Sequence, residues 1–213
     1  MKYLYHGTLR SLLPRILKRG LRPRGKRKSN DQSFAPSHAD LVYLVREAKG
    51  ALWHACRVIE QFHLNDEPVV LRIDASMLDL AAMRPDEDWF NVEYFLSLAN
   101  DEQCKFMDRV HALHEERPDE NTDVILREEH AHLWRKSLAS KLGSAGYKGT
   151  IPRSALSVGE LQQQEVTRTR KRAARRFMTC PCSTCATATT VYARRSTCAG
   201  IHRRRRPSRA RLF

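Results

Sequence analysis

The sequence lacks several features that would assign it to particular classes of protein. None of its apolar stretches approaches the ~20 residues that a membrane-spanning helix needs, which excludes a transmembrane protein. The opening residues, MKYLYHGTLR, contain no apolar run before a small-residue cleavage site, so no secretory signal is visible and we expect a cytoplasmic location. No internal repeat has the period of a solenoid. At 213 residues, the chain is also too short for two large enzymatic domains.

Acidic residues are absent from Thr167 to Phe213, a segment that contains 14 arginines and lysines. This number equals the net charge of +14, so the residues before the segment are neutral overall. The segment has too few apolar side chains to compensate for the entropy of ordering. We therefore expect residues 166–213 to be a basic tail without a core, either disordered or translated from GC-rich DNA in the wrong frame. A genuine tail of this kind would contact nucleic acid or an acidic membrane surface through salt-sensitive contacts.

Two groups of residues could in principle bind a metal ion. His130 and His132 lie in the sequence EEHAH, but residues two apart face different sides of a helix, which favours a charged helix start. Thiolates can also bind zinc or a cluster, and four of the six cysteines lie in the tail, at Cys180, Cys182, Cys185 and Cys198. No apolar residues support these cysteines, so we expect reduced thiols and predict no metal site.

Residues 1–165 have the pattern of one globular domain, with apolar segments separated by Pro, Gly, Asn and Asp. We expect strands near residues 2–7, 41–45, 69–73 and 147–152, and helices near 9–20, 46–64 and 131–146. Gly20 is expected to cap the first helix, and residues 83–129 are mixed and partly helical. Because the connections are long and irregular, the alternation of strands and helices favours a small α+β fold.

The sharpest local feature is the tetrapeptide Tyr5, His6, Gly7 and Thr8 at the end of the first expected strand. Glycine lets a ligand approach the backbone closely because it has no Cβ. The imidazole offers a nitrogen that can donate to or accept from a hydroxyl, and Thr8 could cap the following helix. A packing or turn role is the alternative for these residues.

The opening LYHGTLRSLLPRILKRGLRP resembles the first strand and helix of the ADP-ribosyltransferase superfamily. Three later pieces follow in the order expected of that family. Val42, Tyr43 and Leu44 before a helix with Ala51, Trp53 and Ala55 resemble its second motif, PVVLRID resembles the strand behind the pocket, and GYKGTIP resembles a late strand. The resemblance covers residues 1 to about 160.

The resemblance implies a split antiparallel or mixed sheet with flanking helices, and NAD bound with its nicotinamide in a cleft between two half-sheets. It implies that His6 hydrogen-bonds a hydroxyl of the nicotinamide ribose, that the backbone of Gly7 holds the carboxamide beside Thr8, and that Tyr43 stacks on the nicotinamide. The expected activity is transfer of ADP-ribose from NAD to a macromolecular acceptor, with release of nicotinamide. Such a reaction passes through an oxocarbenium-like cation, which needs orientation and electrostatic support.

The family's third site residue is a glutamate on or near the late strand, where it orients the ribose and activates the acceptor. The first acidic residue after the late strand here is Glu160, which we take as the candidate. A solvated charge on a terminal helix or loop is the alternative.

The RNA 2′-phosphotransferases form one branch of the superfamily that shares the LYHGT segment, and they provide a second functional hypothesis. Their amino-terminal lobe, which grips RNA phosphate, has no counterpart expected in this chain. A basic rim of Arg22, Arg24, Lys26, Arg27 and Lys28 could substitute for it, or could be a solvated loop. A non-catalytic module that binds a nucleotide or nucleic acid is the remaining alternative.

Overall fold

The computed structural model describes residues 1–25, 38–141, 143–159 and 169. Its centre is a six-stranded sheet in the order β4-β5-β2-β1-β3-β6, and every pair of neighbouring strands is antiparallel. The strands are β1 (Tyr3–Leu9), β2 (Leu41–Val45), β3 (Pro68–Asp74), β4 (Met83–Pro85), β5 (Ser144–Lys148) and β6 (Leu156–Val158). The mixed α and β composition expected from the sequence is confirmed.

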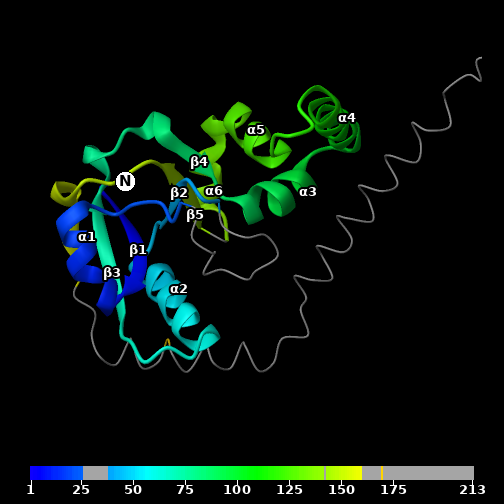
Figure 1. Cartoon of the computed structure of the whole chain (residues 1–213). Coiled ribbons are helices and arrows are strands. Elements are labelled where there is room, and N and C mark those ends of the chain that lie inside the picture. Colours follow the sequence, from blue (N-terminus) through cyan, green and yellow to red (C-terminus); the bar gives the residue numbers. More distant parts are fainter. Residues whose placement is uncertain (26–37, 142, 160–168, 170–213) are drawn as a thin grey trace, which may run out of the picture.

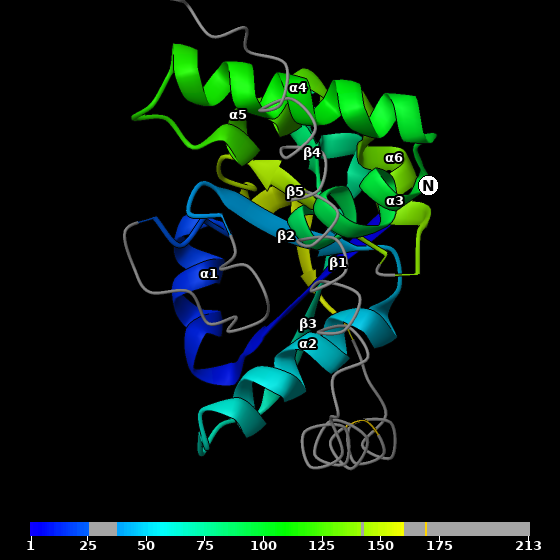
Figure 2. The same cartoon turned by 90° about the vertical axis from the view of Figure 1, so that its right-hand side faces the viewer.

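Helices surround the sheet at its faces and at one edge. They are α1 (Leu13–Arg19), α2 (Ala48–Gln61), the π-helix η4 (Trp89–Tyr94), α3 (Phe95–Ser97), α4 (Asn100–Glu116), α5 (Thr122–Glu129) and α6 (Trp134–Ala139). Short 3₁₀ turns lie at Arg10–Leu12, Ala75–Met77, Leu80–Ala82, Ala131–Leu133 and Arg153–Ala155. In Figures 1 and 2, α3, α4 and α5 gather at the β4 edge, whereas α1 and α2 lie by β1 and β3. Within the described residues, no helix is long and apolar enough to cross a membrane.

Strand alternation divides the core between the two faces of the sheet. Leu71 and Ile73 of β3 pack in a large cluster with residues of α1 and α6, whereas Val70 packs on the other face with α2. A third cluster is formed by aromatic and aliphatic residues of η4, α3, α4 and α5, including Phe90. The helices at the β4 edge therefore have their own apolar core beside the sheet.

The sheet parts between β1 and β2. These strands pair at a single position, Tyr5 opposite Val45, whereas β1 pairs with β3 at seven positions and β2 with β5 at five. The sheet consequently consists of two well-paired halves, β4-β5-β2 and β1-β3-β6, that are joined by one paired position.

Several sequence expectations change in detail. Strand β1 continues through Leu9, and no side chain caps the turn and helix that follow, so the expected capping role of Thr8 is wrong. The helix expected at 131–146 ends at Ala139, because Ser144 to Gly146 begin β5 between β2 and β4. Gly20, with φ of 76°, ends α1 as predicted, since a left-handed backbone favours glycine.

Candidate functional site

His6 and Tyr43 meet at the parting of the sheet. The Nδ1 atom of His6, in β1, lies 2.9 Å from the backbone carbonyl oxygen of Tyr43, in β2. Because a carbonyl only accepts, this contact requires that Nδ1 carry the proton. The neutral ring then presents Nε2 as a hydrogen-bond acceptor. Burial lowers the pKa of His6, the contact with the Tyr43 carbonyl opposes that change, and the charge of nearby His54 reinforces it. Burial is the largest of these effects, so the neutral form of the ring is favoured.

The hydroxyl of Tyr43 forms its hydrogen bonds with Glu87 and His38. It donates to Oε1 of Glu87 and accepts from the backbone N–H of His38 at 2.7 Å. The same N–H lies 3.0 Å from Oε1 of Glu87. Burial raises the pKa of the Tyr43 phenol, and the Glu87 charge and hydrogen bond raise it further. The phenol is therefore held protonated in a half-buried residue, and its oxygen is occupied by Glu87 and His38.

Glu87 is itself paired with a buried arginine. Nη1 of Arg127, in α5, lies 2.8 Å from Oε1 of Glu87, and these two side chains are 4% and 10% exposed. The contact is an ion pair without the alignment of a hydrogen bond, while Nε of Arg127 donates to the carbonyl of Asp123 at 3.2 Å. Burial raises the pKa of Glu87, and the Arg127 charge followed by the Tyr43 hydroxyl limits the rise. The cluster thus links β2, the segment after β4, and α5.

The rings of His6 and Tyr43 start from different sides of the sheet. Tyr43 shares its side of β2 with Val45, which packs with Tyr5 in the cluster beneath α2. His6 follows Tyr5 along β1, so by strand alternation its Cβ points to the other side. The structure therefore joins the two residues through the ring of one and the backbone of the other, and a ligand that touches both rings must lie across the parting.

Gly7 and Thr8 have structural roles in the same strand. A Cβ at Gly7 would lie 1.9 Å from the carbonyl oxygen of Ala51, so Gly7 is required for α2 to pack against β1. Thr8 is buried and lies opposite Val69 of β3. These observations support the packing alternative for both residues, and contact with a ligand stays a prediction.

Some predicted site residues lie outside the described part of the chain. These are Glu160, the rim residues Lys26, Arg27 and Lys28, and the cysteines at 180, 182, 185 and 198. Of the remaining rim residues, Arg22 donates to the carbonyl of Arg19 and Arg24 to that of Gly25, each at 3.3 Å.

The EEHAH segment is described, and its first histidine has a local partner. Nδ1 of His130 lies 2.8 Å from the carbonyl of Leu126, one turn earlier in α5. No group of three or more His, Cys, Asp or Glu side chains among the described residues could hold a metal ion.

Sequence reasoning missed Glu87, Arg127 and His38. Two signals were present: Glu87 lies between the buried Met83 and the aromatic pair Trp89–Phe90, and Arg127 directly follows the apolar run 124–126. Charged residues inside apolar segments often have a buried partner, because an unpaired buried charge is costly. The pairing of two residues forty positions apart could not be read from either segment alone.

No protein-family model, curated protein or solved structure matches this chain. The geometry of the described residues is therefore the basis for any functional assignment.

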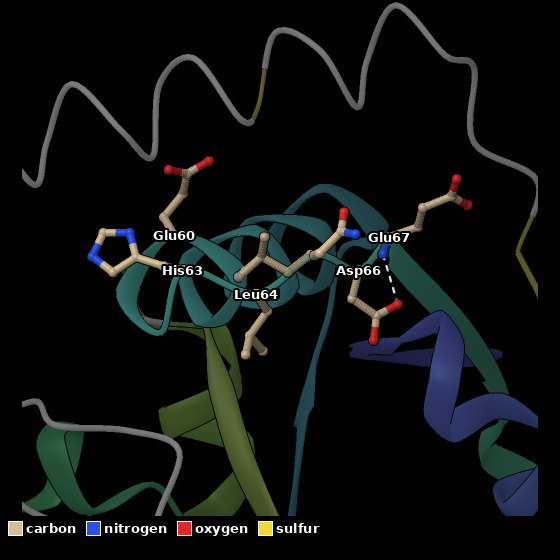
Figure 3. A pocket seen from close by; sticks show the side chains of 7 residues that line it. Glu60, His63, Leu64, Asp66 and Glu67 are labelled. Carbon is tan, nitrogen blue, oxygen red and sulfur yellow. Dashed lines mark hydrogen bonds between the residues drawn. The ribbon is translucent and has the colours of Figure 1, made fainter.

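A separate surface pocket of about 560 Å³ lies where α2 leads into β3 (Figure 3). It is lined by Ile59, Glu60, His63, Leu64, Asn65, Asp66 and Glu67. Asp66 accepts from the Glu67 backbone N–H at 2.7 Å, as drawn in Figure 3, and from the Ser11 hydroxyl at 2.5 Å. The Ser11 hydroxyl is the main reason that the pKa of Asp66 is lowered. Of the predicted site residues that the structure describes, His6, Gly7, Thr8 and Tyr43 do not line this pocket.

Proposed function

We propose that the protein is a cytoplasmic NAD-dependent ADP-ribosyltransferase that binds NAD across the parting between β1 and β2. The supporting observation is the contact between His6 Nδ1 and the Tyr43 carbonyl at the place where the two half-sheets separate. The resemblance to the family implied that the nicotinamide lies between two half-sheets and that His6 and Tyr43 contact this part of NAD. Glu160 remains the candidate for acceptor activation.

His6 has a chemical state suited to the proposed role. With its proton on Nδ1, the ring can accept a hydrogen bond at Nε2 from a hydroxyl of the nicotinamide ribose. Fixing that ribose orients the glycosidic bond to nicotinamide. When this bond breaks, its electron pair leaves with nicotinamide and positive charge develops on the ribose, where oriented dipoles stabilise the transition state. The imidazole therefore acts by orientation and needs no change in its protonation.

Tyr43 is suited to bind through its ring. Its hydroxyl is already bonded to Glu87 and His38, so nicotinamide would meet the aromatic surface. Stacking of aromatic rings contributes about 0.5–1.5 kcal/mol beyond the burial of area. This arrangement would direct the nicotinamide ring toward β2 and the ribose toward β1.

Nicotinamide release from NAD by the full chain tests the proposal. We expect release above background in the native protein and a loss of roughly 100-fold in His6→Ala, the size expected when a positioning contact is removed. His111→Ala is the matched control, because His111 is an exposed histidine in α4. Equal release by native protein and His6→Ala would remove His6 from the mechanism, and no release with any acceptor would overturn the proposed activity.

The basic tail supports a second candidate function, binding of nucleic acid, because it contains the whole net charge. Affinity for single- or double-stranded nucleic acid should then fall steeply with salt and disappear when residues 166–213 are removed. A protein of the 2′-phosphotransferase type would instead consume NAD only with RNA carrying a 2′-phosphate. Comparing protein, RNA with and without that phosphate, and DNA as acceptors distinguishes these alternatives.

A further inference from the structure

We infer that Glu87 and Arg127 are positioning residues that set the orientation of the Tyr43 ring for NAD. The inference rests on the proposed function for its ligand, but the contacts within the cluster do not depend on it. It gives a role to a buried ion pair that the proposed chemistry otherwise leaves unused.

The phenol of Tyr43 is held at its hydroxyl end as well as at the strand. A tyrosine ring extending from a strand can rotate about two side-chain bonds, and each bond must be restrained for a stacking surface to be preformed. The Tyr43 hydroxyl donates to Glu87 and accepts from the His38 backbone at 2.7 Å, so the far end of the ring is fixed on two sides. A ring held at both ends loses less entropy when a ligand stacks on it.

Glu87 is held in turn by Arg127. The residue is 8% exposed, and an isolated carboxylate at such a position would be strongly disfavoured. Arg127, itself 3% exposed, supplies the compensating charge 2.8 Å away and comes from α5 on the far side of β4. The orientation of a side chain in β2 is thereby tied to the helices at the sheet edge.

The same contacts argue against a direct chemical role for Glu87. Its Oε1 atom is approached by the Tyr43 hydroxyl, the His38 N–H and Arg127 Nη1. A general base must reach the proton that it removes, directly or through one water. A buried carboxylate whose Oε1 accepts two hydrogen bonds and forms an ion pair with a guanidinium is suited to fixing its neighbours.

The test uses the full chain and measures NAD affinity by calorimetry. Tyr43→Phe removes the hydroxyl but keeps the ring, and the double variant Glu87→Leu/Arg127→Met removes both charges together, which avoids leaving one of them unpaired. Each should raise the Kd for NAD about tenfold, a loss of affinity that lies within the range an aromatic contact contributes. Combining all three substitutions should raise it no further, because the ion pair acts through the hydroxyl. Glu87→Gln/Arg127→Met keeps an acceptor for the hydroxyl without leaving a buried charge unpaired, and its Kd for NAD should stay within about threefold of native.

A second measurement follows the ring without any ligand. In protein labelled with ¹³C at tyrosine Cε, the Tyr43 resonance is assigned by its loss in Tyr43→Phe and should shift and broaden in the double variant. A Tyr43 resonance that is unchanged there would overturn the inference, as would additive losses of NAD affinity. If native protein neither binds NAD nor releases nicotinamide, the proposed function fails, while the resonance still decides whether Glu87 and Arg127 hold the ring.

Discussion

Gly7 of β1 faces the backbone of Ala51 in α2 so closely that a Cβ on the glycine would lie 1.9 Å from the Ala51 carbonyl oxygen. The next nearest atoms, the Ala51 carbonyl carbon and the Ala55 nitrogen, are also backbone, at 2.9 and 3.1 Å. Backbone cannot move aside as a flexible side chain can. The glycine of the YHGT segment therefore determines how closely α2 approaches the strand that presents His6.

We expect Gly7→Ala to destabilise the protein by about 3 kcal/mol, the upper part of the usual cost of overpacking. Gly50→Ala is the matched control, because Gly50 lies in α2 and a Cβ there would meet only Val45 side-chain atoms at 3.6 Å or more. That change should stabilise the helix by about 0.5–1 kcal/mol. Urea unfolding of the two variants measures both values, and equal effects would contradict the backbone contact between β1 and α2.

Removing the carboxylate of Glu87 should be among the most damaging single changes to stability. Glu87→Ala leaves the Arg127 guanidinium buried without a counter-charge, for which we expect a loss of about 3–5 kcal/mol. Glu129→Ala is the comparison, because Glu129 pairs with Arg109 at 2.5 Å where both side chains are more than a third exposed. That loss should be about 1 kcal/mol or less. Similar losses in chemical denaturation would show that the Glu87–Arg127 pair is not buried.

The lowered pKa of His6 predicts a pH dependence of stability. Burial is the main cause of the lowering, so the unfolded chain takes up the His6 proton more readily than the folded chain. The stability supplied by the neutral ring should therefore be complete above pH ~6.5 and should decrease as the pH falls below that value. His38, whose pKa burial also lowers, adds a dependence of the same sign.

Comparing native protein with His6→Gln isolates the first contribution, because His38 is present in both. The free energy of unfolding, measured from pH 7.5 to 5, should fall less in the variant. Equal slopes would mean that His6 titrates alike in the folded and unfolded chain.

Glu128 has a lowered pKa as well and should produce a pH dependence of the same sign as that of His6, but at lower pH. The hydrogen bond from Arg84 is the main cause that lowers its pKa to about 2, and Lys148 contributes at 2.8 Å. The unfolded carboxyl, with a pKa of about 4.5, binds protons first, so this contribution to stability is present above that value and is lost as the pH falls toward 2. A carboxyl NMR titration should show Glu128 ionised at pH 3, and Glu128→Gln should flatten acid unfolding between pH 4.5 and 2.

Local pattern was sufficient for the elements that depend on neighbours in sequence. The run Leu41–Val45 forms β2 as predicted, the expected strand 69–73 lies within β3, and Gly20 ends α1. Burial of Ala51, Leu52, Ala55 and Ile59 follows the helical spacing seen in the sequence. In each case the sequence pattern and the resulting element depend on residues that are close together in the chain.

The parts that were missed depend on contacts between distant segments. Ser144 to Gly146 were expected to end a helix, but they form the start of β5 because this strand pairs with β2 and β4 on its two sides. Thr8 was expected to cap a helix, but its pairing with Val69 keeps it in a strand. Glu87 accepts a hydrogen bond from Tyr43, which lies 44 positions earlier in the sequence, so no local spacing could predict this contact.

The single paired position between β1 and β2 also bears on how the molecule can move. Strand pairing between β1 and β2 is limited to Tyr5 and Val45, so the two halves are held together chiefly by apolar packing, in a cluster that contains Leu71 of one half and Leu44 of the other. The imidazole of His6 spans this parting to the Tyr43 carbonyl. A rotation of one half against the other would therefore change the distance between His6 Nδ1 and the Tyr43 carbonyl as well as the packing, so this distance would report how far the two halves separate.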